Sequence, residues 1–499
     1  MRKHQPAAGR LWAGVDVGTQ SLRVLLVDGA GTVAGHGSQA LTSQRTGDRH
    51  EQDPTDWWSA LGAAFRRALR DVEPTRVGAL AICGTSGTFL LAGPDGEART
   101  PALMYDDSRA QREAEDVAKA GADVWAALGY ATQPSWALPK LLWLLRHGPA
   151  ELRADLDAGR VALRHCGDYL ATRLTGSPVA TDWSTALKTG YDPDGGGWPT
   201  GVLDKLGLPS GTLPRVVRPG TRIGALDPTG AAHTGLPVGV PVRAGMTDGC
   251  AAQIAAGALE AGSWNSVLGT TLVLKGVTPV RLTDPVGAVY SHRHPDGGWL
   301  PGGASNVGAG ALEARFPGVD RAGMDRAAAG YEPAGGLVYP LRSPGERFPF
   351  VRPAAEPFEV GTFADDADRY AAVLQGVAYV ERLCYAHLRR LGADVTGPLS
   401  LTGGATRSRY WSQLRADVLG REVTLPRTAE PAFGMAVLAA AGDDNLTEAA
   451  RRMVRVARVL APRPGTRERF AEPYARFVDA LAVRGHVDEE FATYAKELS

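Results

Sequence analysis

The chain has 499 residues, more than one compact core holds, so two or three domains are expected. Basic and acidic residues number 54 each, and the zero net charge gives no overall basic field that would favour nucleic acid or an anionic membrane as a partner. The four cysteines lie far apart and form no CxxC pair, which argues against a disulfide framework and a zinc site. Asp16 interrupts any signal sequence, and Gly, Thr and Ser interrupt the least polar stretch, 77–93, so we expect a cytoplasmic protein.

The first predicted element is a hairpin that follows a disordered segment, residues 1–10. Residues 11–17 and 22–27 have the apolar pattern of buried strands, and Gly18-Thr19-Gln20-Ser21 forms the turn between them. Backbone N–H groups at such a turn bind phosphate without a lysine. Asp16 directly precedes the turn, where it can hold Mg²⁺ through water. A plain hairpin with a polar turn is the structural alternative.

A helix and a second buried strand follow. Asp53 and Pro54 have the residue types of an N-cap and a first helical position, and the tryptophans Trp57 and Trp58 are expected to anchor the core. Residues 77–83 form a strand that runs into small hydroxyl residues, a common ligand-site edge in α/β folds.

Polar groups for a ligand occur in two places after that strand. Ser86 lies in the small-residue turn 84–88, which has a structural turn as its alternative. Tyr105 and Asp106 offer hydrogen bonds suited to a polyol, although an exposed start of a helix explains them as well. Residues 110–175 are expected to be largely helical and to serve packing, and a polar loop is expected at 182–186.

One carboxylate, Asp248, lies near the middle of the chain among Gly, Thr and small residues. The apolar segment 241–244 precedes it, and the small residues 251–258 favour a helix after it. The simplest interpretation is that Asp248 caps this helix.

The second half repeats the opening pattern. Residues 262–274 again form strand, Gly-Thr turn and strand, with Gly269, Thr270 and Thr271 at the turn, about half the chain beyond the first hairpin. Two such hairpins suggest a duplicated architecture that closes on one phosphate chain. Residues 302–306 are expected to form a small-residue loop, and His292 and His294 to lie on the surface of a strand rather than bind metal.

A strand-to-helix bend follows near residue 403. Residues 399–401 form a short strand and 408–419 a helix, and between them Gly403, Gly404 and Ala405 let a flat ring approach the backbone closely. Residues 430–436 are expected to begin a helix near this bend. The charged, helical region from 445 is expected to cap the second domain.

Four of these stretches together resemble the FGGY carbohydrate kinases, on the actin/Hsp70-like (ribonuclease H-like) ATPase fold. The resemblance implies an α/β protein of two domains with an ATP and sugar cleft between them. The N-terminal domain, 11–258, would bind sugar and phosphate, and the C-terminal domain, 259–499, would bind the nucleotide. The stretches are Gly14 to Ser21, Glu51 to Pro54 with Trp57 and Trp58, Gly245 to Gly249, and Thr402 to Ala405.

Within this family the sequence resembles the D-ribulose kinase branch, which is related to the xylulokinases. A typical xylulokinase has Gln-Met-His-Gly where this chain has Gly84-Thr85-Ser86-Gly87, so Ser86 replaces a bulkier sugar-contacting His. The Arg-Glu pair of a typical glycerol kinase is also missing from this region. The chain has no GxxxxGK[ST] motif, which excludes a P-loop. The other stretches that suggest this branch are 287–292, 302–306 and 343–349.

The resemblance implies a role for each candidate site residue. Asp248 would be the general base for transfer of the ATP γ-phosphate to a terminal hydroxyl of a ketopentose, most simply D-ribulose, with Mg²⁺ near Asp16. Alternatives are a D-xylulose or other polyol kinase, a sugar-binding regulatory homologue, and an Hsp70-like ATPase. The last would need a separate peptide-binding domain, and the residues after 445 are too few to form one. The expected partners are the small sugar and ATP, without nucleic acid or membrane, and a homodimer is allowed. Sugar-binding residues would be Asp16, Ser86, Asp248, Tyr105 and Asp106, and ATP-binding residues Gly18, Thr19, Gln20, Gly269, Thr270, Thr271, Gly403, Gly404 and Ala405.

Overall fold

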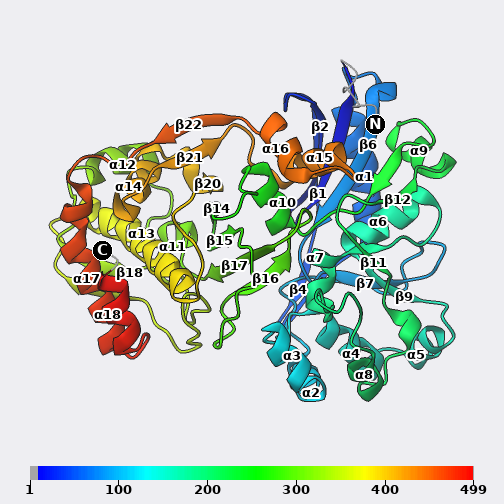
Figure 1. Cartoon of the computed structure of the whole chain (residues 1–499), viewed down its shortest axis with the longest axis horizontal. Helices are drawn as coiled ribbons and strands as arrows, with labels where there is room; N and C mark the ends of the chain where they lie inside the picture. The colour runs from blue at the N-terminus through cyan, green and yellow to red at the C-terminus, as the bar shows by residue number, and fades with distance from the viewer. Residues whose placement is uncertain (1–8, 498–499) are drawn as a thin grey trace. The chain divides into compact units, whose positions relative to one another are not determined.

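The computed structural model describes residues 9–497, which fall into two compact units (Figure 1). The division near residue 258 resembles the predicted one, but two later segments, His292–Gly297 and Thr428–Val454, belong to the first unit. Most of the segment expected to be disordered, residues 1–8, lies outside the described residues. Among the described residues, no helix is both long and apolar enough to cross a membrane.

The first unit is built on a six-stranded sheet with the order β12-β13-β6-β1-β2-β3. β1 pairs antiparallel with β2 and parallel with β6, and β6 pairs parallel with β13. The predicted opening hairpin is therefore confirmed. The strands are β1 Leu11–Val17, β2 Ser21–Asp28, β3 Val33–Ala40, β6 Val77–Gly84, β12 Arg222–Ala225 and β13 Pro241–Arg243.

Helices cover this sheet, and their contacts explain why β1 is almost continuously apolar. α1 (Pro54–Ala68) packs on β2 and β3, with the predicted Asp53 cap accepting a hydrogen bond from the Thr55 N–H. α15 (Pro431–Ala441) packs on β1 and β6. A Cβ at Gly14 would lie 1.8 Å from the Ala432 carbonyl oxygen, so this position of β1 accepts only glycine. The helix at 430–436 belongs to the first unit.

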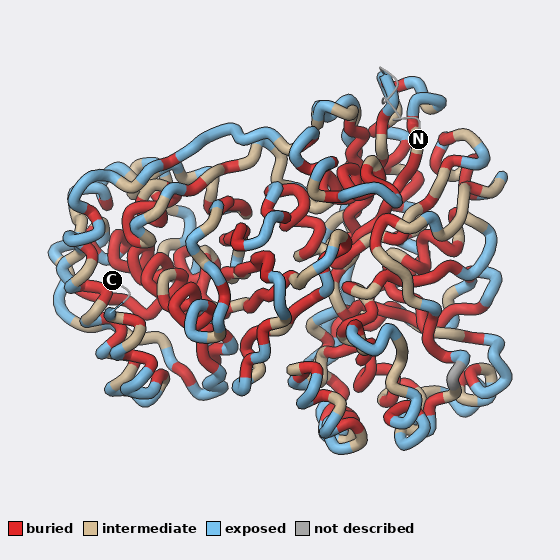
Figure 2. Tube along the Cα trace, in the orientation of Figure 1, coloured by how far each residue is buried: buried red, intermediate tan, exposed pale blue. Residues whose placement is uncertain are grey.

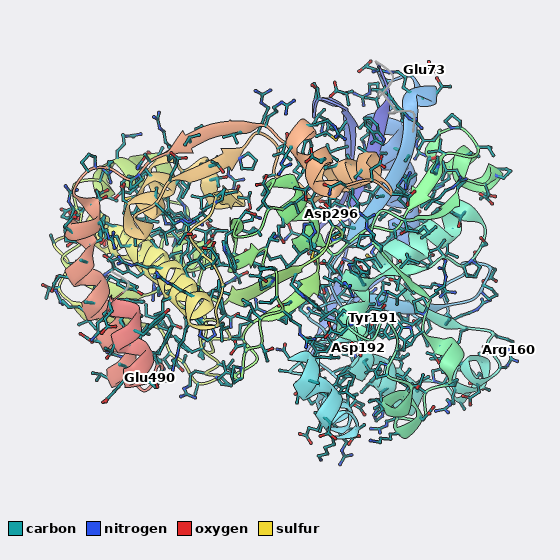
Figure 3. All side chains as sticks on the ribbon, in the orientation of Figure 1. Glu73, Arg160, Tyr191, Asp192, Asp296 and Glu490 are labelled. Carbon is teal, nitrogen blue, oxygen red and sulfur yellow. The ribbon has the colours of Figure 1, made fainter. Side chains whose placement is uncertain are left out.

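The segment that carries α15 is fixed to the first unit at its end by a carboxylate. Asp296, labelled in Figure 3, accepts hydrogen bonds from the Leu446 N–H at 3.0 Å and the Thr447 N–H at 2.8 Å, at the start of α16 (Leu446–Met453). The Arg218 guanidinium donates to the same carboxylate at 3.1 Å. The prediction that the whole region from 445 caps the second domain is wrong for α16.

The remaining part of the first unit holds a smaller sheet, β4-β5-β8-β7-β9, and most of its helices. The region 110–175 is largely helical, as predicted. The strands of the smaller sheet are β4 Gln44–Thr46, β5 Arg49–Gln52, β7 Phe89–Ala92, β8 Ala102–Leu103 and β9 Ala162–His165, and a separate two-stranded sheet consists of β10 Thr181–Asp182 and β11 Val216–Val217. The helices are α2 Gln111–Ala120, α3 Ala122–Leu128, α4 Ala137–His147, α5 Ala150–Asp157, α6 Cys166–Thr175, α7 Trp183–Ala186, α8 Thr200–Lys205, α9 Pro228–Thr234 and α10 Asp248–Ala255.

The second unit is built on a seven-stranded sheet with the order β16-β17-β15-β14-β20-β21-β22. Its long helix α13 (Asp366–Arg390), yellow in Figure 1, is buried along most of its length, and Figure 2 shows this burial continuing into the sheet. The strands of this sheet are β14 Trp264–Leu268, β15 Leu272–Gly276, β16 Tyr290–Arg293, β17 Trp299–Ser305, β20 Leu399–Thr402, β21 Val423–Pro426 and β22 Val456–Leu460, and a separate two-stranded sheet consists of β18 Gly336–Tyr339 and β19 Phe358–Gly361. The other helices are α11 Ala309–Arg315, α12 Arg321–Ala328, α14 Arg409–Leu419, α17 Thr466–Val483 and α18 Glu489–Glu497.

Two sequence predictions for residues 292–306 are wrong. Residues 302–305 are not a loop but the end of β17, paired with β15 from Lys275↔Gly302 to Leu272↔Ser305. Their small side chains fit a crowded strand, since a Cβ at Gly303 would meet the Phe348 ring at 2.7 Å. His292 and His294 are buried, 1% and 2% exposed, rather than on the surface.

Candidate active site

Three parallel strands of the first unit end side by side and bring the predicted residues together. The register pairs Asp16 with Cys83 and Val17 with Gly84, and Gly84 bridges to Thr247. Ligands of α/β folds bind at the carboxyl ends of such strands. The turn after β1, the loop after β6 and the start of α10 therefore meet at one edge, which carries Asp16, Ser86 and Asp248.

The turn after β1 is held by a glutamine that the sequence analysis did not assign. The Gly18 N–H donates to the Ser21 carbonyl at 3.1 Å and closes the turn. The buried Gln52 amide donates to the Thr19 carbonyl at 2.7 Å, and the Trp57 indole N–H donates to Gln52 Oε1 at 2.7 Å. Trp57 is 1% exposed, as predicted for a core anchor, and it also orients the side chain that supports the turn.

Asp16 lies in an electrostatic environment that opposes its charge. Burial, followed by the negative Asp248 and Glu430, raises the pKa of Asp16 to about 7, although Arg23 and a hydrogen bond from Cys83 act in the opposite direction. Carboxylates that repel each other in a buried place fit a bound cation. Among residues 9–497 no group of three or more His, Cys, Asp or Glu side chains is arranged to hold a metal. Two carboxylates suffice for Mg²⁺ when phosphate oxygens and water complete its ligands.

Asp248 is the first residue of α10, and Thr247 occupies the N-cap position. The capping interpretation of Asp248 is therefore wrong by one residue. The Asp248 carboxylate accepts a hydrogen bond from the Gly249 N–H at 2.7 Å. The approach to Asp248 needs glycine, because a Cβ at Gly245 would lie 1.8 Å from the Ile82 carbonyl oxygen of β6.

The segment expected to be a polar loop, 182–186, supports the start of α10. It forms β10 and α7, and the Ser184 hydroxyl accepts a hydrogen bond from the Thr247 N–H at 3.1 Å. That hydroxyl donates to Asp182 Oδ1 at 2.5 Å, and Asp182 is 3% exposed. Burial raises the pKa of Asp182 to about 6, against hydrogen bonds from Ser184 and Thr185. No local pattern in the sequence marks this contact.

Ser86 has a buried hydroxyl without a hydrogen-bond partner among the described residues. Neighbouring groups fix the loop around it: Thr85 and Thr88 hydroxyls lie 2.6 Å apart, and the Lys188 ammonium donates to the Ser86 carbonyl at 3.2 Å. A buried hydroxyl that lacks a partner is unfavourable unless a ligand supplies one.

Tyr105 and Asp106 differ in how they relate to this edge. Tyr105 hydrogen-bonds Thr19, and its pKa is raised by burial and by the charges of Asp106 and Asp248, so it lies with the turn after β1. Asp106 is engaged elsewhere, since Arg45 and His50 Nδ1 each contact its carboxylate at 2.5 Å. Burial raises the pKa of Asp106, but these two hydrogen bonds outweigh it and hold the pKa below its ordinary value.

The second unit carries the other Gly-Thr hairpin, between β14 and β15. The Gly269 N–H donates to the Thr271 carbonyl at 3.0 Å. The start of α11 is joined to the hairpin, because the Ala309 N–H donates to the Gly269 carbonyl at 2.9 Å and the Gly310 N–H to the Thr270 carbonyl at 3.1 Å.

The bend after β20 lies against this hairpin. Gly403 has φ +88°, and a Cβ there would lie 2.5 Å from the Leu268 carbonyl oxygen, so glycine serves a close approach of two backbones. Ser408 caps α14, as its hydroxyl accepts from the Trp411 N–H at 2.9 Å.

A pocket of about 660 Å³ opens beside the hairpin and the bend, entirely within the second unit. It contains Gly269, Thr270, Gly404 and Ala405 of the predicted ATP-binding residues. The sequence analysis missed Asp325, which accepts hydrogen bonds from Ser408 Oγ at 2.6 Å and Tyr370 Oη at 3.0 Å. The other lining residues are Ala309, Gly310, Leu312, Glu313, Arg321, Ala322, Tyr370, Arg407, Ser408 and Trp411.

Comparison with known proteins gives consistent matches over both units. Residues 11–255 match the FGGY family of carbohydrate kinases, N-terminal domain, and residues 265–442 match its C-terminal domain. A xylulose kinase of Streptomyces rubiginosus is 32% identical over 468 residues, covering 89% of this chain and 91% of the relative, and that of Escherichia coli K12 is 30% identical over 86% and 89%.

Solved structures agree in fold. The xylulose kinase of Rhodospirillum rubrum is 26% identical with a TM-score of 0.84, covering 95% of this chain and 99% of that one. Plasmodium falciparum glycerol kinase with ADP is 17% identical and shares the fold, with a TM-score of 0.85. The match covers 96% of this chain and 99% of that one. The chain therefore belongs to the FGGY family of carbohydrate kinases, which are ATP-dependent sugar kinases of two-domain α/β fold.

Proposed function

We propose that this kinase transfers the γ-phosphate of ATP to a terminal hydroxyl of a ketopentose, with D-ribulose as the preferred acceptor. The observation that carries the proposal is the edge of the first unit where Asp16, Asp248 and the unpartnered hydroxyl of Ser86 occur together. These groups supply a base, a second carboxylate and a hydrogen-bonding group for a sugar.

In the proposed reaction, Asp248 accepts the proton of the sugar hydroxyl while the oxygen of that hydroxyl forms a bond to the γ-phosphorus. The bond from that phosphorus to the β–γ bridging oxygen breaks, and ADP leaves. A carboxylate is a weak base toward an alcohol, so positioning and charge neutralisation provide most of the rate. Asp16 would hold Mg²⁺, which supplies the positive charge that offsets the phosphates when it is bound.

The nucleotide is assigned to the second unit. Its pocket of about 660 Å³ is lined by Gly269 and Thr270 of the hairpin and by Gly404 and Ala405 of the bend. The hairpin would hold phosphates and the bend would lie against the adenine ring. Gly18, Thr19 and Gln20 of the first unit would contact the phosphate chain through their N–H groups.

The small side chain of Ser86 supports D-ribulose as the acceptor, because it stands where xylulokinases have a histidine. The relatives support a second candidate, D-xylulose, since several proteins named xylulose kinase are 30–33% identical to this chain. Tyr105, which hydrogen-bonds Thr19 and interacts electrostatically with Asp248, would also contribute to sugar binding.

A panel of acceptors tests the proposal. D-Ribulose, D-xylulose, L-ribulose, ribitol and glycerol are compared by ADP release with ATP and Mg²⁺. We expect the highest kcat/KM for D-ribulose, and in Ser86→Ala we expect a rise in KM for this sugar with KM for ATP unchanged. A higher kcat/KM for D-xylulose would replace the first candidate by the second. No turnover of any acceptor, with sugar binding retained, would instead indicate a regulatory homologue.

A further inference from the structure

The second unit has another pocket that shares no lining residue with the nucleotide pocket. Its volume is about 290 Å³, and it lies among α13, the end of α14, α17 and α18. This volume corresponds to about ten water molecules in the liquid. The lining residues are Arg382, Tyr385, Ala386, Arg389, Val395, Thr396, Val418, Leu419, Gly420, Arg421, Arg467, Tyr474 and Ala495.

Four arginines surround this pocket, and they come from three parts of the chain. Arg382 and Arg389 lie two turns apart on one face of α13, Arg421 follows α14, and Arg467 is in the first turn of α17. None of the described residues that line the pocket is an Asp or Glu. The lining therefore concentrates positive charge around one small volume.

Two of these arginines, Arg382 and Arg421, form hydrogen bonds with backbone carbonyl groups. Arg382 donates to the Val418 carbonyl at 3.2 Å, and Arg421 donates to the carbonyls of Val395 and Gly397. Carbonyl groups accept hydrogen bonds but carry no net charge. Burial lowers the pKa of Arg382, and the positive charge of Arg467 acts in the same direction.

Two buried tyrosines add hydrogen-bonding groups to the lining. Tyr474 is fully buried and Tyr385 is 6% exposed, and neither hydroxyl forms a hydrogen bond within the described part of the chain. Their rings also position guanidinium groups, since Arg382 lies 4.2 Å from the Tyr474 ring centroid and Arg421 lies 5.7 Å from that of Tyr385.

A purely structural role explains only part of this cluster. Arg389 near the end of α13 and Arg382 at the last carbonyls of α14 favourably offset the negative ends of those helix dipoles. Arg467 does not fit this explanation, because it lies in the first turn of the 18-residue helix α17, where the dipole disfavours a cation. That same helix end favours an anion.

We propose that this pocket binds the phosphate group of a small phosphorylated metabolite, at a site separate from the nucleotide pocket. A phosphate monoester carries about two negative charges and three acceptor oxygens. Several planar guanidinium groups recognise such an anion better than they recognise a single carboxylate. The two tyrosine hydroxyls would donate to its remaining oxygens.

Isothermal titration calorimetry with D-ribose 5-phosphate at constant ionic strength tests the proposal. Unphosphorylated D-ribose and inorganic phosphate are titrated for comparison, and ADP is present throughout to fill the nucleotide pocket. The double variant Arg389→Ser/Arg467→Ser removes two exposed arginines of the lining. Arg390→Ser/Arg476→Ser is the matched control, because these exposed arginines lie on the same two helices outside the lining.

We expect the Kd for D-ribose 5-phosphate to rise at least tenfold in the lining variant and to stay within twofold in the control. Equal affinity in all three proteins, no binding to the wild type, or tighter binding of D-ribose than of its phosphate would overturn the proposal. If the double variant fails to fold, Arg389→Ser alone decides, with an expected rise of at least threefold.

Discussion

Substitution of Ser184 by alanine tests how the start of α10 is positioned. The Ser184 hydroxyl accepts from the buried Thr247 N–H at 3.1 Å and donates to Asp182 at 2.5 Å. Alanine removes both hydrogen bonds and leaves the Thr247 amide without its acceptor. A buried donor that loses its partner costs about 1–3 kcal/mol, so the free energy of unfolding should fall by that amount.

The same change should affect catalysis through Asp248, which follows Thr247 directly. A displacement of about 1 Å in a catalytic group lowers the rate on the order of 10²-fold. We therefore expect kcat to fall by roughly that factor, while KM for ATP stays unchanged because the pocket proposed for the nucleotide lies in the second unit. ADP release gives kcat and each KM, and urea unfolding gives the stability.

Thr185→Val is the matched control for Ser184→Ala. The Thr185 side chain also hydrogen-bonds Asp182. Its replacement leaves the hydrogen bond from the Thr247 N–H to the Ser184 hydroxyl in place. We expect a loss of stability in the control with a much smaller fall in kcat. If Ser184→Ala lost stability but kept kcat within twofold, the serine would be structural only and the reasoning would be refuted.

Three further predictions concern other parts of the molecule. Asp248→Asn keeps an acceptor for the Gly249 N–H but removes the base, so ADP release should slow by about 10²–10⁴-fold with sugar binding retained in calorimetry. Gly403→Ala should weaken ATP binding and lower the melting temperature, because its Cβ would lie 2.5 Å from the Leu268 carbonyl oxygen. Lys140 is buried and its pKa is lowered to about 7, mainly by burial, from an ordinary 10.5, so its folded form binds the proton less readily than its unfolded form. The free energy of unfolding should therefore rise with pH between about 7 and 10.5, relative to Lys140→Met, in urea titrations.

Each of these has a result that contradicts it. Near-normal turnover of Asp248→Asn would remove the residue from the role of base. Gly465→Ala has a comparable positive φ of +73° with no neighbour within 4 Å, so equal effects at Gly465 and Gly403 would show that backbone strain, and not the approach to Leu268, is responsible. If the free energy of unfolding depended on pH in the same way in the wild type and in Lys140→Met, the pKa of Lys140 would be the same in the folded and unfolded forms, and the prediction would be wrong.

The features that the sequence predicted well depend on neighbours in the chain. Both Gly-Thr hairpins and the helix after Asp53 follow from apolar runs, turn residues and caps within about ten residues of each other. The grouping of Asp16 and Asp248 in one site was expected only from the family resemblance, because no local pattern joins the two residues.

What the sequence did not reveal depends on contacts between distant residues. The hydrogen bond from Thr247 to Ser184 joins positions 63 residues apart, and no local pattern marks it. The burial of His292 was missed because an alternating strand pattern does not say which face is covered. Gly14 similarly gave no sign of α15, whose residues come more than 400 positions later.

The packing of α15 on β1 has a consequence for how the protein is synthesised. β1 emerges from the ribosome among the first residues, but the helix that covers it at Gly14 ends at Ala441. At about 5–20 residues per second, that face of β1 waits roughly 20–90 s for its cover. Nascent chains that stop before residue 431 should therefore expose an apolar strand and depend on chaperones. Because the first unit is made of three separate segments of the chain, it cannot be produced as one uninterrupted fragment.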